Sequence, residues 1–129
     1  MSKWMIAGAV ALMGCTASAA LPKEDTRAQR ELAEELAGRT AGAPTDCIDA
    51  SNVDGPQIID NKTILYRRGR TTWRNDLEGS CPGLAPMDTI VIELHAGEIC
   101  RHDRFRVLEP GSSIPGAYCM MGKFTPYKK

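Results

Sequence analysis

The sequence predicts a mainly β protein, a small antiparallel β-barrel or sandwich of five to six strands preceded by one α-helix. Short β-prone runs recur about every ten residues after residue 46, separated by turns that contain Gly and Pro. A single helical pattern lies before these runs. The chain has 129 residues, 43% of them apolar and 25% charged. That length and composition are typical of one soluble domain.

The first twenty residues have the pattern of an export signal. Lys3 gives a positively charged start, and an apolar run of 11 residues extends from Trp4 to Gly14. A bilayer span needs about 20 apolar residues, so this run is too short to be one. We therefore expect an exported protein with no transmembrane span in its mature chain.

Two cleavage signals overlap in this segment. Ala17-Ser18-Ala19 has the small-x-small form that a general signal peptidase accepts, which makes residues 1–19 the signal peptide of a soluble periplasmic protein. Leu12-Met13-Gly14-Cys15 resembles a lipobox, which makes residues 1–14 the signal and Cys15 the lipidated first residue. In that case the lipid anchors the protein to the outer membrane. Both alternatives stay open.

The cysteine count agrees with export. Either cleavage leaves four cysteines, an even number that favours disulfides in an oxidising compartment. Cys47 opens the predicted β domain and Cys119 lies in its last strand, so a bond between them would hold both ends. The loop with Cys81 leads into a strand that faces Cys100. The prediction is therefore a nested pairing, Cys81–Cys100 inside Cys47–Cys119.

A helix and a linker are predicted between the signal and the β domain, over residues 20–45. The helical pattern extends from Pro22, which suits a first turn, to Ala37, and Gly38 can cap its end. Its apolar stripe is thin, which favours a helix on the domain surface or between domain and membrane. The following residues, 38–45, are rich in Gly and Pro, so the disulfide-braced β domain is predicted to cover residues 46–129.

Within the β domain, the strand predictions follow alternating apolar residues and turn signals. Residues 88–95 alternate most regularly, with Ile90, Ile92 and Leu94 on one face. The predicted strands are 58–59, 62–66, 71–77, 88–95, 99–108 and 117–124, with turns or loops at 67–70, 79–83, 96–97 and 110–116.

Charge is unevenly distributed along a chain of zero net charge. Residues 16–60 hold 9 acidic and 4 basic side chains, whereas residues 61–129 hold 7 acidic and 11 basic ones. The simplest explanation is an acidic helix packed on a basic sheet. The alternative is a basic surface for an anionic envelope component. The zero net charge argues against non-specific nucleic-acid binding.

Several short motifs resemble one known family. They are Cys47-Ile48, Ile59-Asp60-x-x-Thr63-Ile64-Leu65-Tyr66, Trp73-Arg74-Asn75-Asp76-Leu77, Cys81-Pro82-Gly83-Leu84, Ile99-Cys100-x-x-Asp103 and Cys119-x-x-Gly122-x-Phe124. In this order they resemble a family of small exported proteobacterial cell-envelope proteins of unknown function. The resemblance covers residues 46–126. It implies a cell-envelope location and a shared fold, and it implies no activity.

Four titratable residues form the candidate catalytic group: Glu93, His95, His102 and Asp103. Predicted to lie at one end of a hairpin, they could supply general acid–base groups if they came within hydrogen-bond reach of one another. No nucleophile elbow, HExxH or phosphate loop accompanies them, so a polar hairpin end is the preferred interpretation. The cysteine and histidine spacings are too wide for a zinc motif, and no metal or cofactor is predicted.

The candidate binding residues surround the predicted turn at 67–70. Arg67, Arg68 and Arg70 lie in the turn, with Trp73 and Arg74 in the following strand. Arginine forks bind phosphate and carboxylate groups, and an aromatic ring beside them can stack on a sugar or a peptide plane. The alternative is a solvated hairpin tip.

Three functions remain, in order of preference. The first is a non-enzymatic module that binds a partner protein or an anionic envelope component. The second is a periplasmic inhibitor of a hydrolase, which would need a protruding loop, with Leu84–Met87 or Ser112–Pro115 as candidates. The third is a small acid–base enzyme, which would need a concave pocket that contains the histidines.

Overall fold

The computed structural model describes residues 14–15, 17–18 and 23–129, the side chains of residues 23–25 excepted. Most of the predicted signal segment, residues 1–13, 16 and 19, lies outside the described residues, as does Pro22 at the predicted helix start. Cys15 is described and is an exposed free cysteine. In the described part of the chain, no helix combines the length and the apolar character that a membrane crossing requires.

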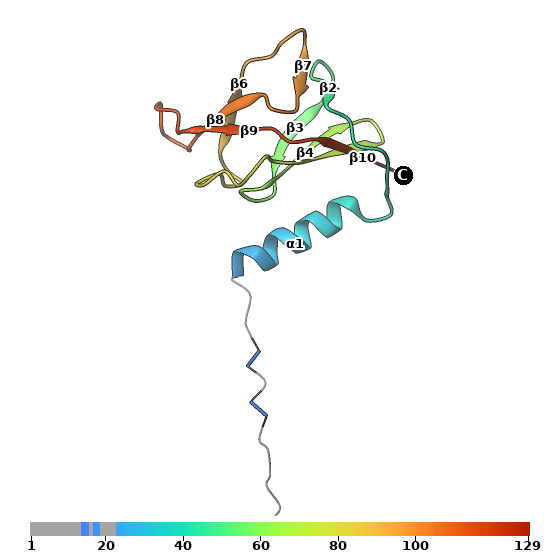
Figure 1. Ribbon diagram of the computed structural model, residues 1–129, viewed down its shortest axis with the longest axis vertical. Coiled ribbons are helices and arrows are strands. Elements are labelled where there is room, and N and C mark those ends of the chain that lie inside the picture. The colour runs from blue at the N-terminus through green and yellow to red at the C-terminus, as the bar shows by residue number, and fades with distance from the viewer. Residues whose placement is uncertain (1–13, 16, 19–22) are drawn as a thin grey trace, which may run out of the picture.

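One helix and three antiparallel sheets make up the described fold (Figure 1). The predicted mainly β class with one leading helix is confirmed, and the sheets do not close into a barrel. Helix α1 covers Lys23–Leu36. The strands are β1 (Thr40–Ala41), β2 (Cys47–Asp49), β3 (Asp54–Ile58), β4 (Thr63–Arg68), β5 (Thr71–Asp76), β6 (Thr89–Ile92), β7 (Glu98–Cys100), β8 (Arg104–Leu108), β9 (Tyr118–Met120) and β10 (Phe124–Lys128).

The largest sheet has five strands in the order β1-β10-β5-β4-β3. A tight hairpin at Gly69, which has a positive φ, joins β4 to β5 as the sequence predicts. The segment 38–45, for which composition favours a linker, is instead held to this sheet. Its β1 pairs with β10, and Thr45 bridges to Phe124. The helix is therefore fastened to the sheet at its C-terminal end.

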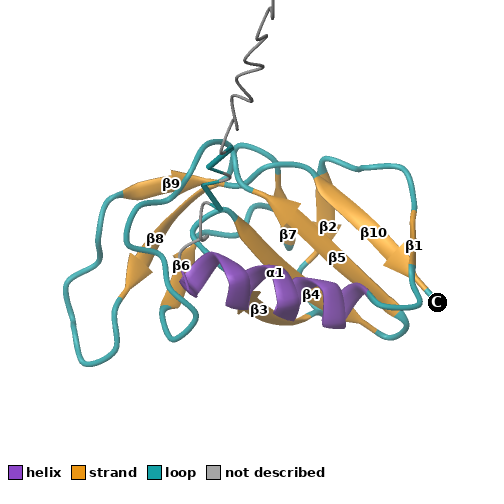
Figure 2. Cartoon of the chain, turned by 90° about the horizontal axis from the view of Figure 1, so that it is seen from below, coloured by secondary structure: helices purple, strands orange, loops and turns teal. Residues whose placement is uncertain are grey.

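Helix α1 lies across one face of the five-stranded sheet (Figure 2). Ala28 and Leu32 of its apolar stripe pack on Ile59 and Leu65. Because neighbouring side chains of a strand point to opposite faces, Ile64 of β4 enters the main core on the other side. That core lies between the sheets. Its buried residues are Ile48, Ile58, Ile64, Tyr66, Cys81, Leu84, Ile99, Phe105, Val107, Met121 and Phe124.

Two disulfides brace the core, with a pairing that differs from the predicted one. Cys47 bonds to Cys100 and Cys81 bonds to Cys119, so the predicted nested pairing is wrong. The cause lies in the strands. Strand β2 pairs with β7, which puts Cys47 directly opposite Cys100. The predicted last strand is in fact two, and its first part, β9, pairs with β8 and carries Cys119 away from Cys47.

Candidate functional site

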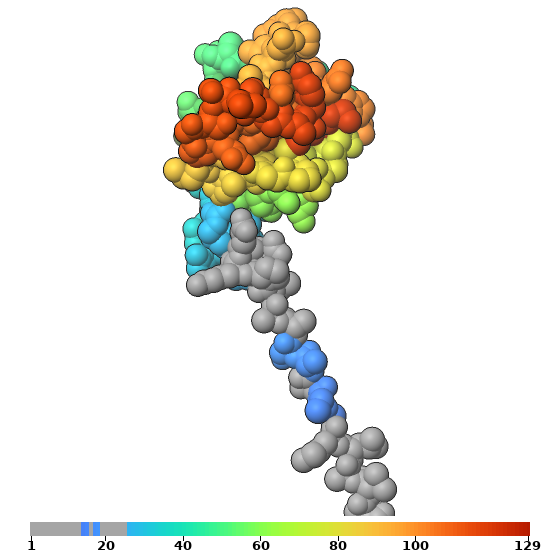
Figure 3. Space-filling view, turned by 90° about the vertical axis from the view of Figure 1, so that its left-hand side faces the viewer, coloured from blue at the N-terminus to red at the C-terminus, as the bar shows by residue number. Residues whose placement is uncertain are grey.

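The outward face of the three-stranded sheet β6-β8-β9 gathers most of the candidate chemistry. Alternation along β8 buries Phe105 and Val107 in the core and directs Arg104 and Arg106 outward. Register places Val91 of β6, Arg106 of β8 and Tyr118 of β9 in one row across this face. In Figure 3 the segment that contains β8 and β9 is coloured orange to red, on the side of the molecule that faces the viewer.

A depression of about 450 Å³ lies on this face. Its lining residues come from β6, β8, β9 and the turns beside them: Val91, Glu93, His95, His102, Asp103, Arg104, Arg106 and Tyr118. The structure thus brings together all four residues of the predicted acid–base group. Sequence reasoning missed the two arginines and Tyr118. The Arg-x-Arg alternation on a predicted strand was the available signal for the arginines.

A tight turn interrupts the predicted strand 99–108 and sets the position of two lining residues. The Asp103 N–H donates to the Cys100 carbonyl at 3.1 Å, and the Cys100 N–H donates to the Asp103 carboxylate at 2.8 Å. His102, between them, has a φ of 70°, in the region that L residues seldom adopt. Cys100 and His102 therefore do not lie on one continuous strand, although the predicted strand 99–108 includes both. The carboxylate of Asp103 holds the turn.

Glu78 is a neighbour of this turn that sequence reasoning did not single out. Its carboxylate accepts a hydrogen bond from Arg101 Nε at 2.6 Å and lies 3.7 Å from His102 Nε2. The hydrogen bond from Arg101 lowers the pKa of Glu78, and the positive charges of Arg101, His102 and Lys123 add to this effect. A lowered pKa means that the pairing stabilises the fold at neutral pH and is lost as the pH falls through that pKa.

The histidines and carboxylates of the acid–base group are not hydrogen-bonded to one another. Among the described residues, no hydrogen bond joins the side chain of His95 or His102 to Glu93 or Asp103. His95 forms a backbone bridge to Glu98. General acid–base catalysis needs groups within hydrogen-bond reach of each other or of a substrate. The four side chains therefore line one depression without hydrogen bonds that link the histidines to the carboxylates.

Arg104 and Arg106 lie beside one aromatic ring. Their guanidinium carbons are 5.6 Å and 5.1 Å from the centre of the Tyr118 ring, within the range of a cation–π contact. Arg106 also donates from Nε to the Gly116 carbonyl at 2.9 Å and from Nη2 to the Pro115 carbonyl at 3.0 Å. Tyr118 is 62% exposed. This face therefore presents two oriented cations and an accessible aromatic ring to solvent.

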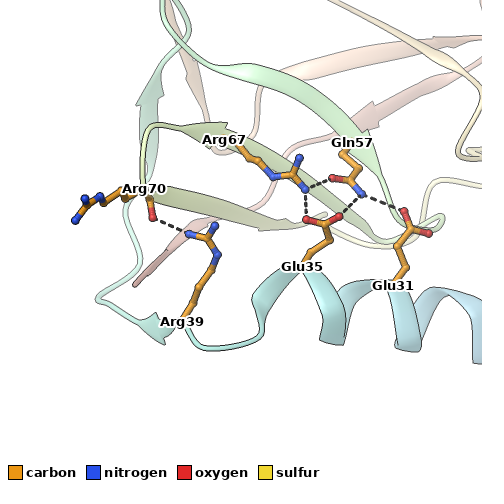
Figure 4. A network of polar contacts seen from close by, with 6 residues as sticks. All are labelled: Glu31, Glu35, Arg39, Gln57, Arg67 and Arg70. Carbon is orange, nitrogen blue, oxygen red and sulfur yellow. Dashed lines mark hydrogen bonds and ion pairs between the residues drawn. The ribbon is translucent and has the colours of Figure 1, made fainter.

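The predicted basic turn lies on the five-stranded sheet, apart from the β6-β8-β9 sheet that carries the depression. Arg67 pairs with Glu35 of α1 and donates to Gln57, as Figure 4 shows. Arg68 lies 3.7 Å from Asp49 and Arg74 lies 3.0 Å from Asp76. The backbone carbonyl of Arg70 accepts a hydrogen bond from Arg39 at 2.6 Å. Trp73, the aromatic residue of this candidate group, packs against the core.

These contacts account for the uneven charge along the chain. Glu31 and Glu35 of the acidic helix both accept hydrogen bonds from Gln57, while Arg67 of the sheet pairs with Glu35 (Figure 4). An acidic helix packed on a basic sheet is the arrangement that the charge pattern favours. Most of the arginines near the turn are thus already paired with carboxylates of the chain itself.

The helix–sheet contact gives a first testable prediction. Replacing Arg67 with Ala should lower the free energy of unfolding by less than about 1 kcal/mol, because ion pairs open to solvent contribute little. Replacing the buried Leu65 beneath the helix with Ala should cost about 2–5 kcal/mol. Urea denaturation of both variants measures the difference. A larger loss for Arg67→Ala than for Leu65→Ala would contradict apolar packing as the main cause of helix docking.

One group of possible metal ligands occurs among the described residues. The ligand atoms of Cys47, Glu98 and Cys100 lie within 4.8 Å of one another. The two sulfurs are bonded to each other, so they have no thiolates to offer a metal.

Two exposed loops adjoin the three-stranded sheet. Met87, 81% exposed, and Ile114, 79% exposed, lie in the two segments that the inhibitor hypothesis singles out. The loop around Ile114 is braced: the Ser112 hydroxyl accepts from the Ile114 N–H at 3.2 Å and donates to its carbonyl at 3.3 Å. Each loop thus presents an apolar side chain to solvent.

Together these features define a disulfide-braced, mainly β domain with a docked helix and an open polar face. The chain belongs to the family described as Family of unknown function (DUF6491), which it matches over residues 1–128. No curated protein and no solved structure matches it.

Proposed function

We propose that this protein is an exported, non-enzymatic binding module of the cell envelope. Its binding surface is the outward face of the β6-β8-β9 sheet, and its ligand is a partner protein or an anionic envelope component. The observation that supports this most is the depression where Arg104 and Arg106 lie beside the exposed ring of Tyr118. Exposed aromatic and arginine side chains are enriched among the residues that dominate binding interfaces.

Export is supported by the pattern of the first twenty residues and by the two disulfides. Cys15, exposed and free, is the lipid anchor under the lipoprotein alternative, and cleavage after Ala19 gives a soluble periplasmic form. Either form places the β domain in an oxidising compartment, where Cys47–Cys100 and Cys81–Cys119 persist.

Binding to a purified envelope preparation tests the proposed surface. The mature protein should sediment with envelope membranes and cell wall, and Tyr118→Ser should reduce the bound fraction at least about tenfold, as expected for loss of a central aromatic contact. Arg70→Ser, on the hairpin of the five-stranded sheet, is the matched control and should bind like the unchanged protein. Equal binding by the Tyr118 and Arg70 variants would contradict the proposal.

The inhibitor function is the second candidate, because the braced loop holds Ile114 almost fully exposed. The same binding experiment separates the two functions. A loop-borne function is lost in Ile114→Asp and kept in Tyr118→Ser, whereas the sheet-face function shows the reverse. An enzymatic function is the third candidate, carried by the two histidines that line the depression.

A further inference from the structure

We infer that the depression on the β6-β8-β9 face binds a phosphate ester, through the guanidinium groups of Arg104 and Arg106. This inference rests on the proposed function and names the ligand chemistry of the same surface. It starts from the two arginines, which stand two positions apart on β8 and so project from one face of the sheet.

These arginines are not neutralised by the chain. In the part of the chain that the structure describes, no carboxylate oxygen lies within 4.0 Å of either guanidinium. Five other arginines do have such a partner: Arg27, Arg67, Arg68, Arg74 and Arg101. The depression thus keeps two adjacent positive charges without a carboxylate partner from the described part of the chain.

The two guanidinium groups are also oriented. Arg106 is held by its hydrogen bonds to the Pro115 and Gly116 carbonyls, which use one N–H of Nε and one of Nη2 and leave three N–H groups for a ligand. The guanidinium of Arg104 lies 5.6 Å from the centre of the same Tyr118 ring and makes no hydrogen bond to another described residue. Because Arg106 is held in place before binding, it loses less freedom on binding than a mobile side chain would.

Two neighbouring forks favour phosphate over carboxylate. A carboxylate has two oxygens, which one arginine fork can occupy alone, whereas a phosphate monoester has three free oxygens and can accept from both forks at once. The carboxylates of Glu93 and Asp103 also line the depression, and that of Asp103 is held in the turn by the Cys100 N–H. Val91 and Tyr118 form an apolar and aromatic wall for the organic part of the ester.

Calorimetric titration with glucose 6-phosphate tests the inference, with glucose and inorganic phosphate as reference probes. We expect saturable binding of glucose 6-phosphate and none of glucose. Arg104→Gln should weaken the binding at least about tenfold, as loss of a charge-assisted hydrogen bond does. Arg30→Gln, at an exposed arginine of helix α1, should leave it unchanged. Arg104→Lys keeps the charge without the fork and should fall between the two.

The same variants identify the source of the phosphate. Binding to phosphatidylcholine vesicles that contain phosphatidic acid, whose headgroup is a phosphate monoester, would support a lipid headgroup as the ligand if it is sensitive to Arg104→Gln and glucose 6-phosphate does not bind. Absence of binding to every phosphate probe, or equal affinity in Arg104→Gln and the unchanged protein, would overturn the inference. The proposed function then survives only if Tyr118→Ser still reduces envelope binding. Arg104 is exposed, and a thermal unfolding curve checks that its variants fold.

Discussion

Gly122→Ala should abolish stable folding of this domain. A Cβ atom at this position would lie 1.7 Å from the carbonyl oxygen of Asp76, where real Cβ contacts essentially never come closer than 3.0 Å. The obstacle is backbone of strand β5, so no side-chain rotation can relieve it, and β5 and the β9–β10 connection would have to separate. We expect the free energy of unfolding to fall by more than about 4 kcal/mol, a value that only severe disruption of a fold produces.

Gly116→Ala is the matched control for this prediction. A Cβ there meets its nearest atom, the Val107 carbonyl oxygen, at 3.5 Å, an ordinary van der Waals distance. Thermal unfolding of both variants, followed by circular dichroism, measures the difference. A cooperative transition for Gly122→Ala at a temperature close to that of Gly116→Ala would show that β5 does not approach Gly122 as described.

Asn75→Ala should produce the second large effect. Asn75 is fully buried, and its side-chain amide makes two hydrogen bonds to the backbone of Gly122. Its Nδ2 donates to the Gly122 carbonyl at 2.8 Å, and its Oδ1 accepts from the Gly122 N–H at 2.9 Å. Truncation leaves both backbone groups buried without these partners. Each unsatisfied group costs about 1–3 kcal/mol, so the free energy of unfolding should fall by about 2–6 kcal/mol.

Asn52→Ala is the control for this second prediction, because Asn52 is exposed and its amide donates to the hydroxyl of the neighbouring Ser51. Chemical denaturation with urea, with a common m-value, gives the two free energies of unfolding. A loss below about 1 kcal/mol for Asn75→Ala, similar to that of an exposed asparagine, would contradict the structural role assigned to this side chain.

Local pattern predicted much of the fold, and long-range pairing caused the main errors. The helix and the β4–β5 hairpin follow from periodicity and turn residues, which act over a few positions. The strand β10 extends past the predicted end at Phe124, although Pro126, a residue that disfavours strands, lies within it. The backbone hydrogen bonds of this segment are made to β1 and β5, and only the tertiary fold reveals that pairing.

The disulfide error has a similar origin. The pattern at residues 99–108 predicts one strand, whereas the Asp103 carboxylate and the positive φ of His102 create a turn there. That turn separates β7 from β8 and lets Cys100 meet Cys47. Residues other than Gly seldom adopt a positive φ. His does so more often than most, but this preference is too weak to mark a turn, so the break was not predictable from composition.

The candidate site was half predictable. Glu93, His95, His102 and Asp103 were singled out as neighbours of one turn, and all four line the depression. Arg104 and Arg106 become part of it through the pairing of β8 with β9, which brings Tyr118 opposite Arg106. The turn arginines drew attention from sequence because they are clustered, although Arg67 pairs with Glu35 of the docked helix and Arg68 lies beside Asp49.

Site-specific photocrosslinking in intact cells tests the central claim most directly. A photoreactive phenylalanine derivative in place of Tyr118 lies on the proposed binding face, and the same derivative in place of Arg70 lies on the hairpin of the other sheet. The binding function predicts a crosslinked adduct at position 118 that weakens when Arg104→Gln is added, with none at position 70. An adduct at position 70 together with none at position 118 would contradict the assignment of the β6-β8-β9 face as the binding surface.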